Sequence, residues 1–190
     1  MSKPATCLQP YGMKKHDATR LYYDLRLGWS GMLKSWAIHP GPSIRAGDRR
    51  EAVEVEVHRR EYLGFEGAIA EGKTGAGTVM LWDRGMWEPL PEYADVDASL
   101  RNGYLRFTLH GEKLKGNWEL IRRESSFQNQ RNPVWDLVKE PDSFARGNHS
   151  GDILEEAPKS VSTGRTLEEI RREWVTGRRK RKSDATLFEM

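Results

Sequence analysis

The sequence predicts a mostly β fold, an antiparallel barrel or sandwich with short helices and one helix near the C-terminus. Apolar and polar residues alternate with period two through the first two thirds of the chain, which is typical of half-buried strands. Six short segments show this pattern, and turns containing Gly, Pro or Asp separate them. Because 37% of the 190 residues are hydrophobic, the chain can bury one core, and we expect a single domain with a tail.

The first clear strand covers residues 21–27. Its apolar face consists of Leu21, Tyr23, Leu25 and Leu27. Its polar face carries Tyr22, Asp24 and Arg26, and a Gly-Trp-Ser-Gly turn follows. The strand is therefore expected to bury one side and to present a phenol, a carboxylate and a guanidinium on the other.

A second strand has the same division, and four further segments complete the set. The apolar face of this strand consists of Val53, Val55 and Val57, and its polar face carries Glu54, Glu56 and His58. The remaining candidate strands are residues 33–38, 77–82, 104–109 and 118–123.

The connecting and C-terminal regions contain different signals. Residues 63–77 are rich in glycine and predict a loop of unusual backbone geometry, but their spacing matches no phosphate-binding glycine motif. After residue 123 the sequence becomes polar and irregular. One helix is expected from residue 167 to about residue 175, since Thr166 and Glu169 form a capping box at its start.

Composition limits the class of protein. The net charge is +3, and a run of five cations at residues 178–182 leaves −2 for the rest of the chain. A salt-sensitive contact between this run and phosphates is one interpretation, and a merely solvated segment is the other. The single cysteine, Cys7, excludes an internal disulfide. No segment resembles a signal or a membrane span, so we expect a soluble, cytoplasmic protein without a membrane partner.

The ionisable residues of the two polar faces are candidates for chemistry. His16 precedes the strand of Asp24 and Arg26, so an imidazole and a carboxylate could converge on one divalent cation beside a guanidinium. His58, with Glu56 on the same face, could lie across the same cleft and bind phosphate or move a proton. The same alternation occurs in any half-exposed strand, so spacing alone also allows a structural role.

Other notable side chains are expected to be structural. His39, His110 and His149 lack neighbours of a catalytic type. Trp36, Trp82 and Trp118 fall within strand patterns, which favours core packing over stacking on nucleic-acid bases.

Several motifs, in order from about His16 to Arg123, resemble the 3′-phosphoesterase family of bacterial and archaeal ATP-dependent DNA ligase D. They begin with His16-Asp-Ala-Thr-Arg-Leu-Tyr-Tyr-Asp-Leu-Arg-Leu27, Leu33-Lys-Ser-Trp-Ala37 and Gly41-Pro-Ser43. They continue with Val55-Glu-Val-His58 and Tyr62, Phe65-Glu-Gly67, Glu71-Gly72, Gly75-Ala-Gly-Thr-Val79, Trp82-Asp83 and His110-Gly-Glu-Lys-Leu-Lys-Gly116.

The resemblance implies a compact β-barrel core and a manganese-dependent enzyme that trims DNA or primer-template 3′ ends in non-homologous end joining. Other divalent transition metals, separate ligase, polymerase and end-binding repair proteins, and a place at the nucleoid fit the same expectation. The implied division of the chain is an N-terminal arm (1–15), a phosphoesterase-like barrel (16–125), peripheral loops with the C-terminal helix (126–176) and a basic flexible tail (177–190).

Residue roles follow from the resemblance, position by position. The implied catalytic residues are His16, Asp24, Arg26 and His58, of which His16 and Asp24 would bind the metal. The implied phosphate-binding residues are Arg26, Arg50, His58 and Tyr62, with Glu56 and Tyr22 in supporting positions.

Two departures from the family pattern leave alternatives open. Tyr22 stands where the family has a histidine, and a neutral phenol is a poor metal ligand. Pro40 stands where a lysine is usual before Gly-Pro-Ser, and His39 beside it could in principle compensate. The leading hypothesis is an active 3′-phosphoesterase. The alternatives are a catalytically impaired DNA-end-binding module of the same family, and a phosphatase or phosphodiesterase that acts on a different nucleotide substrate.

Overall fold

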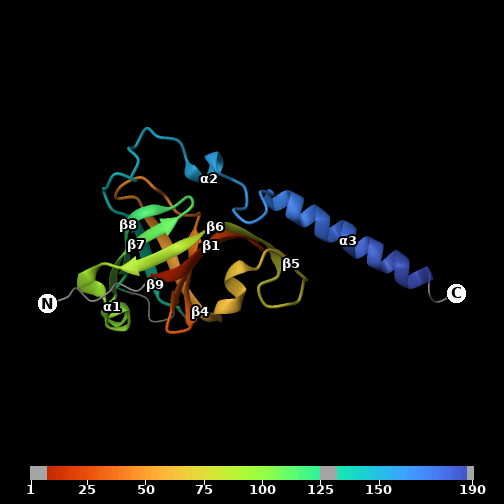
Figure 1. Cartoon of the computed structure of the whole chain (residues 1–190), viewed down its shortest axis with the longest axis horizontal. Helices are drawn as coiled ribbons and strands as arrows, with labels where there is room; N and C mark the ends of the chain where they lie inside the picture. The colour runs from red at the N-terminus through yellow and green to blue at the C-terminus, as the bar shows by residue number, and fades with distance from the viewer. Residues whose placement is uncertain (1–7, 125–131, 188–190) are drawn as a thin grey trace.

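The structure is a computed structural model that describes the backbone of residues 8–124 and 132–187, and the side chains of residues 8–124 and 132–177. Most of the described chain is β-structure (Figure 1). The strands are β1 (Gln9–Asp17), β2 (Leu21–Trp29), β3 (Met32–His39), β4 (Arg49–Arg59), β5 (Gly67–Ile69), β6 (Gly77–Pro89), β7 (Tyr104–Gly111), β8 (Lys115–Arg122) and β9 (Val134–Lys139).

Eight of these strands form a closed antiparallel barrel. Hydrogen bonding runs in the order β1-β2-β3-β4-β9-β8-β7-β6, and β1 pairs with β6 to complete the ring. Strand β5 adds to β6 outside the ring. The barrel expected from the family resemblance is therefore confirmed, and the sandwich is excluded.

All six segments predicted as strands are strands, but β1, β5 and β9 were not predicted. Strand β1 includes residues assigned to the N-terminal arm, and β9 lies in the region assigned to peripheral loops. Both are necessary for closure because β1 joins β2 to β6 and β9 joins β4 to β8. The wider division of the chain into four parts stays a prediction.

The core fills the barrel with aromatic and aliphatic side chains. Trp36, Trp82 and Trp118 are almost completely buried, as their strand patterns predict. On β2 the apolar face is also confirmed for Tyr23 and the leucines that follow it, whereas Leu21, at the strand's start, is 41% exposed. The ionisable residues that alternate with these core residues must therefore lie on the outer face of the barrel.

The predicted apolar face of β4 was wrong. Ala52 is fully buried and pairs with core residue Trp135, whereas Val57 is 56% exposed. Glu54 is on the core-facing side as well, where its carboxylate accepts a hydrogen bond of 2.9 Å from Trp135 Nε1. This bond satisfies two polar groups that burial would otherwise penalise, so a carboxylate can lie on the core-facing side of β4, where the pattern predicted valines.

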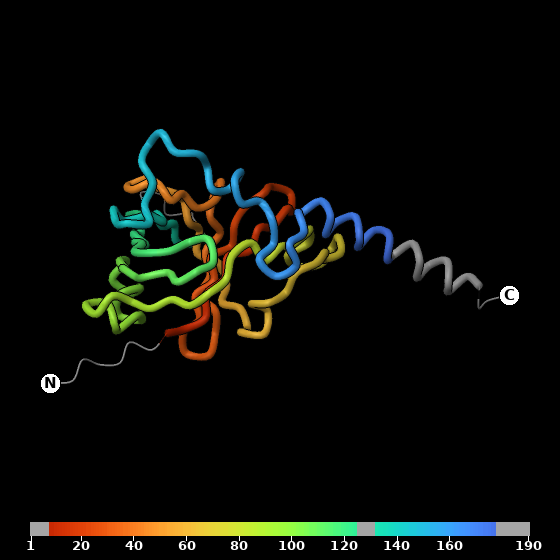
Figure 2. Tube along the Cα trace, turned by 45° about the horizontal axis from the view of Figure 1, so that its top comes forward, coloured from red at the N-terminus to blue at the C-terminus, as the bar shows by residue number. Residues whose placement is uncertain are grey.

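The helices lie outside the barrel. They are the α-helices α1 (Val96–Asn102), α2 (Ile153–Glu156) and α3 (Leu167–Leu187), with short 3₁₀ helices η1 (Arg60–Gly64) and η2 (Pro91–Tyr93). Helix α3 begins as predicted, with Thr166 N donating to Glu169 and Glu169 N donating to Thr166 Oγ1. Its predicted end at about residue 175 was wrong, because the helix continues to Leu187 and leads away from the barrel (Figures 1 and 2). Side chains of the basic run, 178–182, lie outside those described.

The glycine-rich segment between η1 and β6 has the backbone geometry that its sequence predicts. Gly67, Gly72, Gly75 and Gly77 all have positive φ. At Gly77 a Cβ atom would lie 2.3 Å from the carbonyl oxygen of Asp17, so only glycine allows this close approach of β6 to β1. No helix of the described chain is long and apolar enough to cross a membrane.

Candidate functional site

A row of ionisable residues runs across the outer face of neighbouring strands β1, β2, β3 and β4. In the β1–β2 register, Lys14 is opposite Asp24 and His16 is opposite Tyr22. In the β2–β3 register, Arg26 is opposite Ser35. Strand pairing thus brings together His16, Asp24 and Arg26, which the sequence analysis had selected.

The centre of the site is an ion pair between Asp24 and Arg26. Asp24 Oδ2 accepts from both Nε and Nη2 of Arg26, at 2.8 and 2.7 Å. Asp24 is only 5% exposed, and its other oxygen, Oδ1, is buried without a hydrogen-bond partner. A buried carboxylate oxygen without a partner is costly, and a bound cation would satisfy it.

His16 is held at both ring nitrogens. Its Nε2 lies 3.3 Å from the carbonyl oxygen of Ala76, which can only accept, so Nε2 is assigned the hydrogen. The lone pair is then on Nδ1, which accepts a 2.6 Å hydrogen bond from the Tyr22 hydroxyl. Burial lowers the pKa of His16, which keeps the ring neutral.

Tyr22 is a hydrogen-bond donor in this arrangement and a poor ligand. Burial and the charge of Asp24 raise its pKa to about 12, so the phenol is protonated at neutral pH. Its hydroxyl takes up the lone pair of His16 that would otherwise be available to a metal.

His58 lies beside Arg26 across β3. Ser35 Oγ donates to the carbonyl oxygen of Leu33 and lies 3.0 Å from His58 Nδ1, so the consistent assignment has Nδ1 donating to Ser35. The Nε2 lone pair then remains available for a proton. Burial lowers the pKa of His58 and the Arg26 guanidinium lowers it further, so the ring is neutral at pH 7.

Lys14 contributes a second cation that the sequence analysis missed. It is 1% exposed, and its ammonium donates to the carbonyl oxygen of Phe65, just after η1. Burial and the charge of Arg26 lower its pKa to about 7. Its position opposite Asp24 could have been found only from the pairing of β1 with β2.

The remaining predicted residues have different surroundings. Tyr62 contacts the site through its backbone, since its carbonyl oxygen accepts from Arg26 Nη1 at 3.3 Å, while its side chain is 50% exposed. Glu56 is exposed, and its charge acts on His58. Arg50 pairs with core residue Leu137, which puts it on the opposite face of β4 from the site, and it forms an ion pair with Asp48 at 3.7 Å.

His39 does not act as a replacement ligand in this structure. It is the last residue of β3, pairs with Glu51 of β4 and lies on the side of the strand that Ser35 occupies. Among the described residues, no hydrogen bond or ion pair joins it to His16 or Asp24. The compensation that its sequence position allowed is therefore not observed.

The donor set fits a divalent cation as a site with two protein ligands. Among the side chains that the structure describes, residues 8–124 and 132–177, no three His, Cys, Asp or Glu converge as a metal cluster. Asp24 Oδ1 is free, and His16 Nδ1 becomes free when the Tyr22 hydroxyl turns away. Hard cations such as Mg²⁺ and Mn²⁺ commonly take one or two protein ligands and complete their shell with water and phosphate oxygens.

Comparison with known proteins gives one consistent family. Residues 14–122 match the family described as the DNA Ligase D 3′-phosphoesterase domain. The chain is 46% identical over 165 residues, 87% of its length, to the multifunctional non-homologous end joining protein LigD of Pseudomonas aeruginosa. It is 40% identical over 114 residues, 58% of its length, to the LigD protein of Mycolicibacterium smegmatis.

These relatives are much longer proteins. The chain spans 19% of the P. aeruginosa protein and 15% of the M. smegmatis protein, so it corresponds to one part of each. The matched residues include β1 to β8 of the barrel, apart from the start of β1, and every residue of the outer-face site. The chain therefore belongs to the DNA ligase D 3′-phosphoesterase domain family.

Proposed function

We propose that the chain is a divalent-metal-dependent 3′-phosphoesterase that removes 3′-phosphates and 3′-terminal ribonucleotides from DNA ends during non-homologous end joining. The observation that carries the proposal is the buried, unpartnered Oδ1 of Asp24 beside the Arg26 guanidinium and His58. A free carboxylate oxygen, a guanidinium and a neutral imidazole within one site are the groups that phosphoryl transfer to water requires.

His16 Nδ1 and Asp24 Oδ1 would hold the cation, with Mn²⁺ favoured by the mixed nitrogen and oxygen donors. When bound, the metal would neutralise charge on the phosphate oxygens and lower the pKa of a bound water. Arg26 keeps its positive charge at the site while it orients Asp24, so the guanidinium favours binding of the phosphate dianion.

His58 is suited to move a proton. Its Nδ1 is held by Ser35, which fixes the ring and directs Nε2 away from β3. Because its pKa is lowered, Nε2 can accept a proton from the attacking water or return one to the leaving oxygen. The Tyr62 side chain would contact the phosphate from η1, and the negative charge of Glu56 would act to raise the pKa of His58. Because Arg50 lies on the opposite face of β4 from the site, its side chain would have to reach around the end of the barrel to contact the phosphate.

A second function is favoured by one specific contact. The Tyr22 hydroxyl lies 2.6 Å from His16 Nδ1 and covers the lone pair that a metal needs. If this hydrogen bond persists with metal present, the chain is a DNA-end-binding module that positions other repair proteins instead of an enzyme. Separate ligase and polymerase partners fit either function, because the relatives named as multifunctional contain far more chain than this family domain. Both functions imply a cytoplasmic protein that works at the nucleoid.

The test is trimming of a 5′-labelled primer-template that ends in a 3′-phosphate or in a single ribonucleotide, with and without Mn²⁺. We expect shortening or loss of the phosphate only with metal. Asp24→Asn should abolish it, because the amide removes the anionic ligand while keeping the shape of the side chain. Asp97→Asn, on α1, is the matched control and should keep full activity. Binding of the same DNA without trimming in any metal would support the end-binding function and refute the enzyme.

A further inference from the structure

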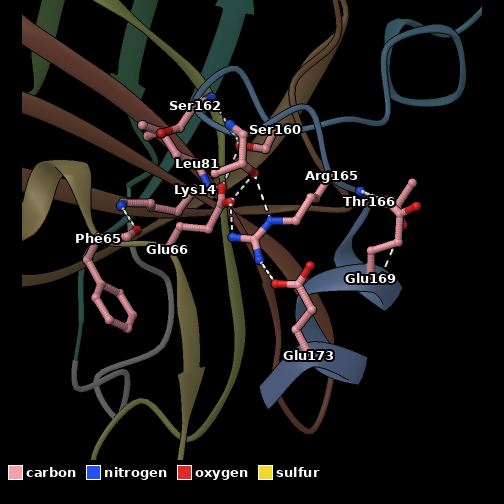
Figure 3. A network of polar contacts seen from close by, with 11 residues as sticks. Lys14, Phe65, Glu66, Leu81, Ser160, Ser162, Arg165, Thr166, Glu169 and Glu173 are labelled. Atoms are coloured by element: carbon pink, nitrogen blue, oxygen red, sulfur yellow. Dashed lines mark hydrogen bonds and ion pairs between the residues drawn. The ribbon is translucent and has the colours of Figure 1, made fainter. Parts of the chain in front are cut away.

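Glu66 is a buried carboxylate that the proposed chemistry does not use. Its side chain is 5% exposed, and it lies between η1 and β5. It accepts four hydrogen bonds (Figure 3). The donors are Leu81 N at 2.9 Å, Ser160 Oγ at 2.5 Å, Thr163 Oγ1 at 2.5 Å and Arg165 Nη2 at 3.1 Å.

These donors come from two distant parts of the chain. Leu81 belongs to β6 of the barrel, whereas the other three belong to the segment that precedes α3, 94 to 99 residues after Glu66 in the sequence. Burial alone would raise the pKa of Glu66, but the hydrogen bonds outweigh it and the pKa is lowered. The carboxylate is therefore charged, and each of its bonds is charge-assisted.

Further hydrogen bonds hold the segment that precedes α3 at this contact. Val161 N donates to the carbonyl oxygen of Leu81, and Ser160 N donates to the carbonyl oxygen of Arg165 at 2.8 Å. Arg165 also forms an ion pair with Glu173, in the second turn of α3. The segment thus links Glu66 on one side to the first turns of α3 on the other (Figure 3).

Glu66 also belongs to the segment, residues 60–66, that forms one wall of the candidate site. The carbonyl oxygen of Tyr62 accepts from Arg26, and the carbonyl oxygen of Phe65 accepts from Lys14. Both carbonyls belong to residues 60–66, where no residue of η1 is fully buried and the half-buried Leu63 packs over Gly12 of β1. The position of this wall therefore depends on the packing of Leu63 and on hydrogen bonds at its two ends, the site on one and Glu66 on the other.

We propose that Glu66 is a positioning residue, and that residues 160–173 act through it as a brace that fixes the wall of residues 60–66 against Arg26 and Lys14. The inference rests on the proposed function for its catalytic consequence, but the brace itself is a property of the fold. It makes α3 part of the site's support, so the barrel alone would hold a looser phosphate-binding wall.

The test removes the brace from its far end. Arg165→Gln loses the ion pair to Glu66 at one end of the brace and the ion pair to Glu173 of α3 at the other, and it leaves the wall's own sequence unchanged. Arg172→Gln is the matched control, because it also removes an arginine near the start of α3, but one whose ion pair is with the exposed Glu168, at 2.9 Å. Hydrogen exchange is measured for backbone amides of residues 60–67 and of the barrel strands, in the full chain.

We expect Arg165→Gln to raise exchange in residues 60–67 by about tenfold, the effect of losing one hydrogen bond to a charged group, and the control to leave it unchanged. Glu66→Gln should raise it at least as much, and adding Arg165→Gln to it should have little further effect. Unchanged exchange in the wall, or an equal increase in every barrel strand, would overturn the proposal, since the first denies support and the second indicates general destabilisation.

A second measurement separates this inference from the proposed function. For a 3′-phosphorylated oligonucleotide, Arg165→Gln should raise the KM for trimming more than it lowers kcat, because the wall positions Arg26. If the wild-type chain trims nothing, the exchange experiment still decides the brace. If the wild type trims and Arg165→Gln changes neither exchange nor KM, the brace is refuted and the enzyme stands.

Discussion

The buried ammonium of Lys14 makes a specific prediction about stability and pH. Lys14 is 1% exposed, and its pKa is lowered from 10.5 to about 7, first by burial and then by the charge of Arg26. In the unfolded chain the same ammonium has the ordinary lysine pKa. Between these two values, the unfolded chain therefore binds one more proton at Lys14 than the folded chain does.

This difference in bound protons fixes the sign of the change in stability with pH. Where the unfolded state binds more protons, the free energy of unfolding rises with pH, by about 1.4 kcal/mol per pH unit for one proton. The penalty of burying Lys14 is largest below pH 7 and disappears above about pH 10.5. Because the folded form is still partly protonated at pH 7, the rise from pH 7 to pH 9 is about 2 kcal/mol.

Lys14→Met tests this value with a side chain of similar length and no charge. Urea unfolding is measured at pH 7 and pH 9 for the wild type and the variant. Loss of the bond to the Phe65 carbonyl costs the variant about 1–3 kcal/mol, but this cost is nearly the same at both pH values and cancels. We expect the wild type to gain about 2 kcal/mol more than the variant between the two pH values.

The control is Lys115→Met, which removes an exposed ammonium from β8 and should leave the wild-type pH dependence intact. Equal gains in the wild type and Lys14→Met would refute the reasoning, because they would mean that Lys14 titrates alike in the folded and unfolded chains. Such a result would also mean that Lys14 is fully protonated in the folded site at pH 7.

Three further predictions concern other parts of the molecule. Tyr22→His should tighten Mn²⁺ binding by about 10–100-fold in titration calorimetry, since it adds an imidazole and frees His16 Nδ1, and no gain would show that Tyr22 is not the weak point. Deleting residues 178–182 should reduce the slope of log Kobs against log salt for duplex DNA by up to about 4, and an unchanged slope would exclude the basic run from DNA contact. Trp135→Phe should destabilise the fold by about 1–3 kcal/mol in urea unfolding because it leaves the Glu54 carboxylate without its donor, and a smaller loss would mean that water replaces the indole.

Local patterns predicted the parts of the site that belong to one strand. The alternation of β2 gave the outer face of Asp24 and Arg26, because side-chain direction in a strand depends only on the backbone. The capping box at Thr166 likewise gave the start of α3, since both of its hydrogen bonds join residues three positions apart. Each of these features is determined within a few residues.

The features that were missed depend on contacts between distant residues. The place of Lys14 opposite Asp24 follows from closure of the barrel by β1, and nothing in the local sequence of β1 specifies its partner. The face of β4 follows from the bond between Glu54 and Trp135, 81 residues apart. The support of the wall by Glu66 similarly depends on a segment that precedes the last helix.

The two proposed functions differ at a single atom of this structure. Arg26 supplies positive charge beside Asp24 whether or not metal is present, so the proposed affinity for a phosphorylated end does not require the metal. The proposed chemistry does require the metal, because the Arg26 guanidinium has no lone pair with which to activate a water. The proposed function therefore depends on whether His16 Nδ1 accepts from the Tyr22 hydroxyl or binds a metal, and the same outer face would serve as an end-binding surface in the first case and as a phosphoesterase site in the second.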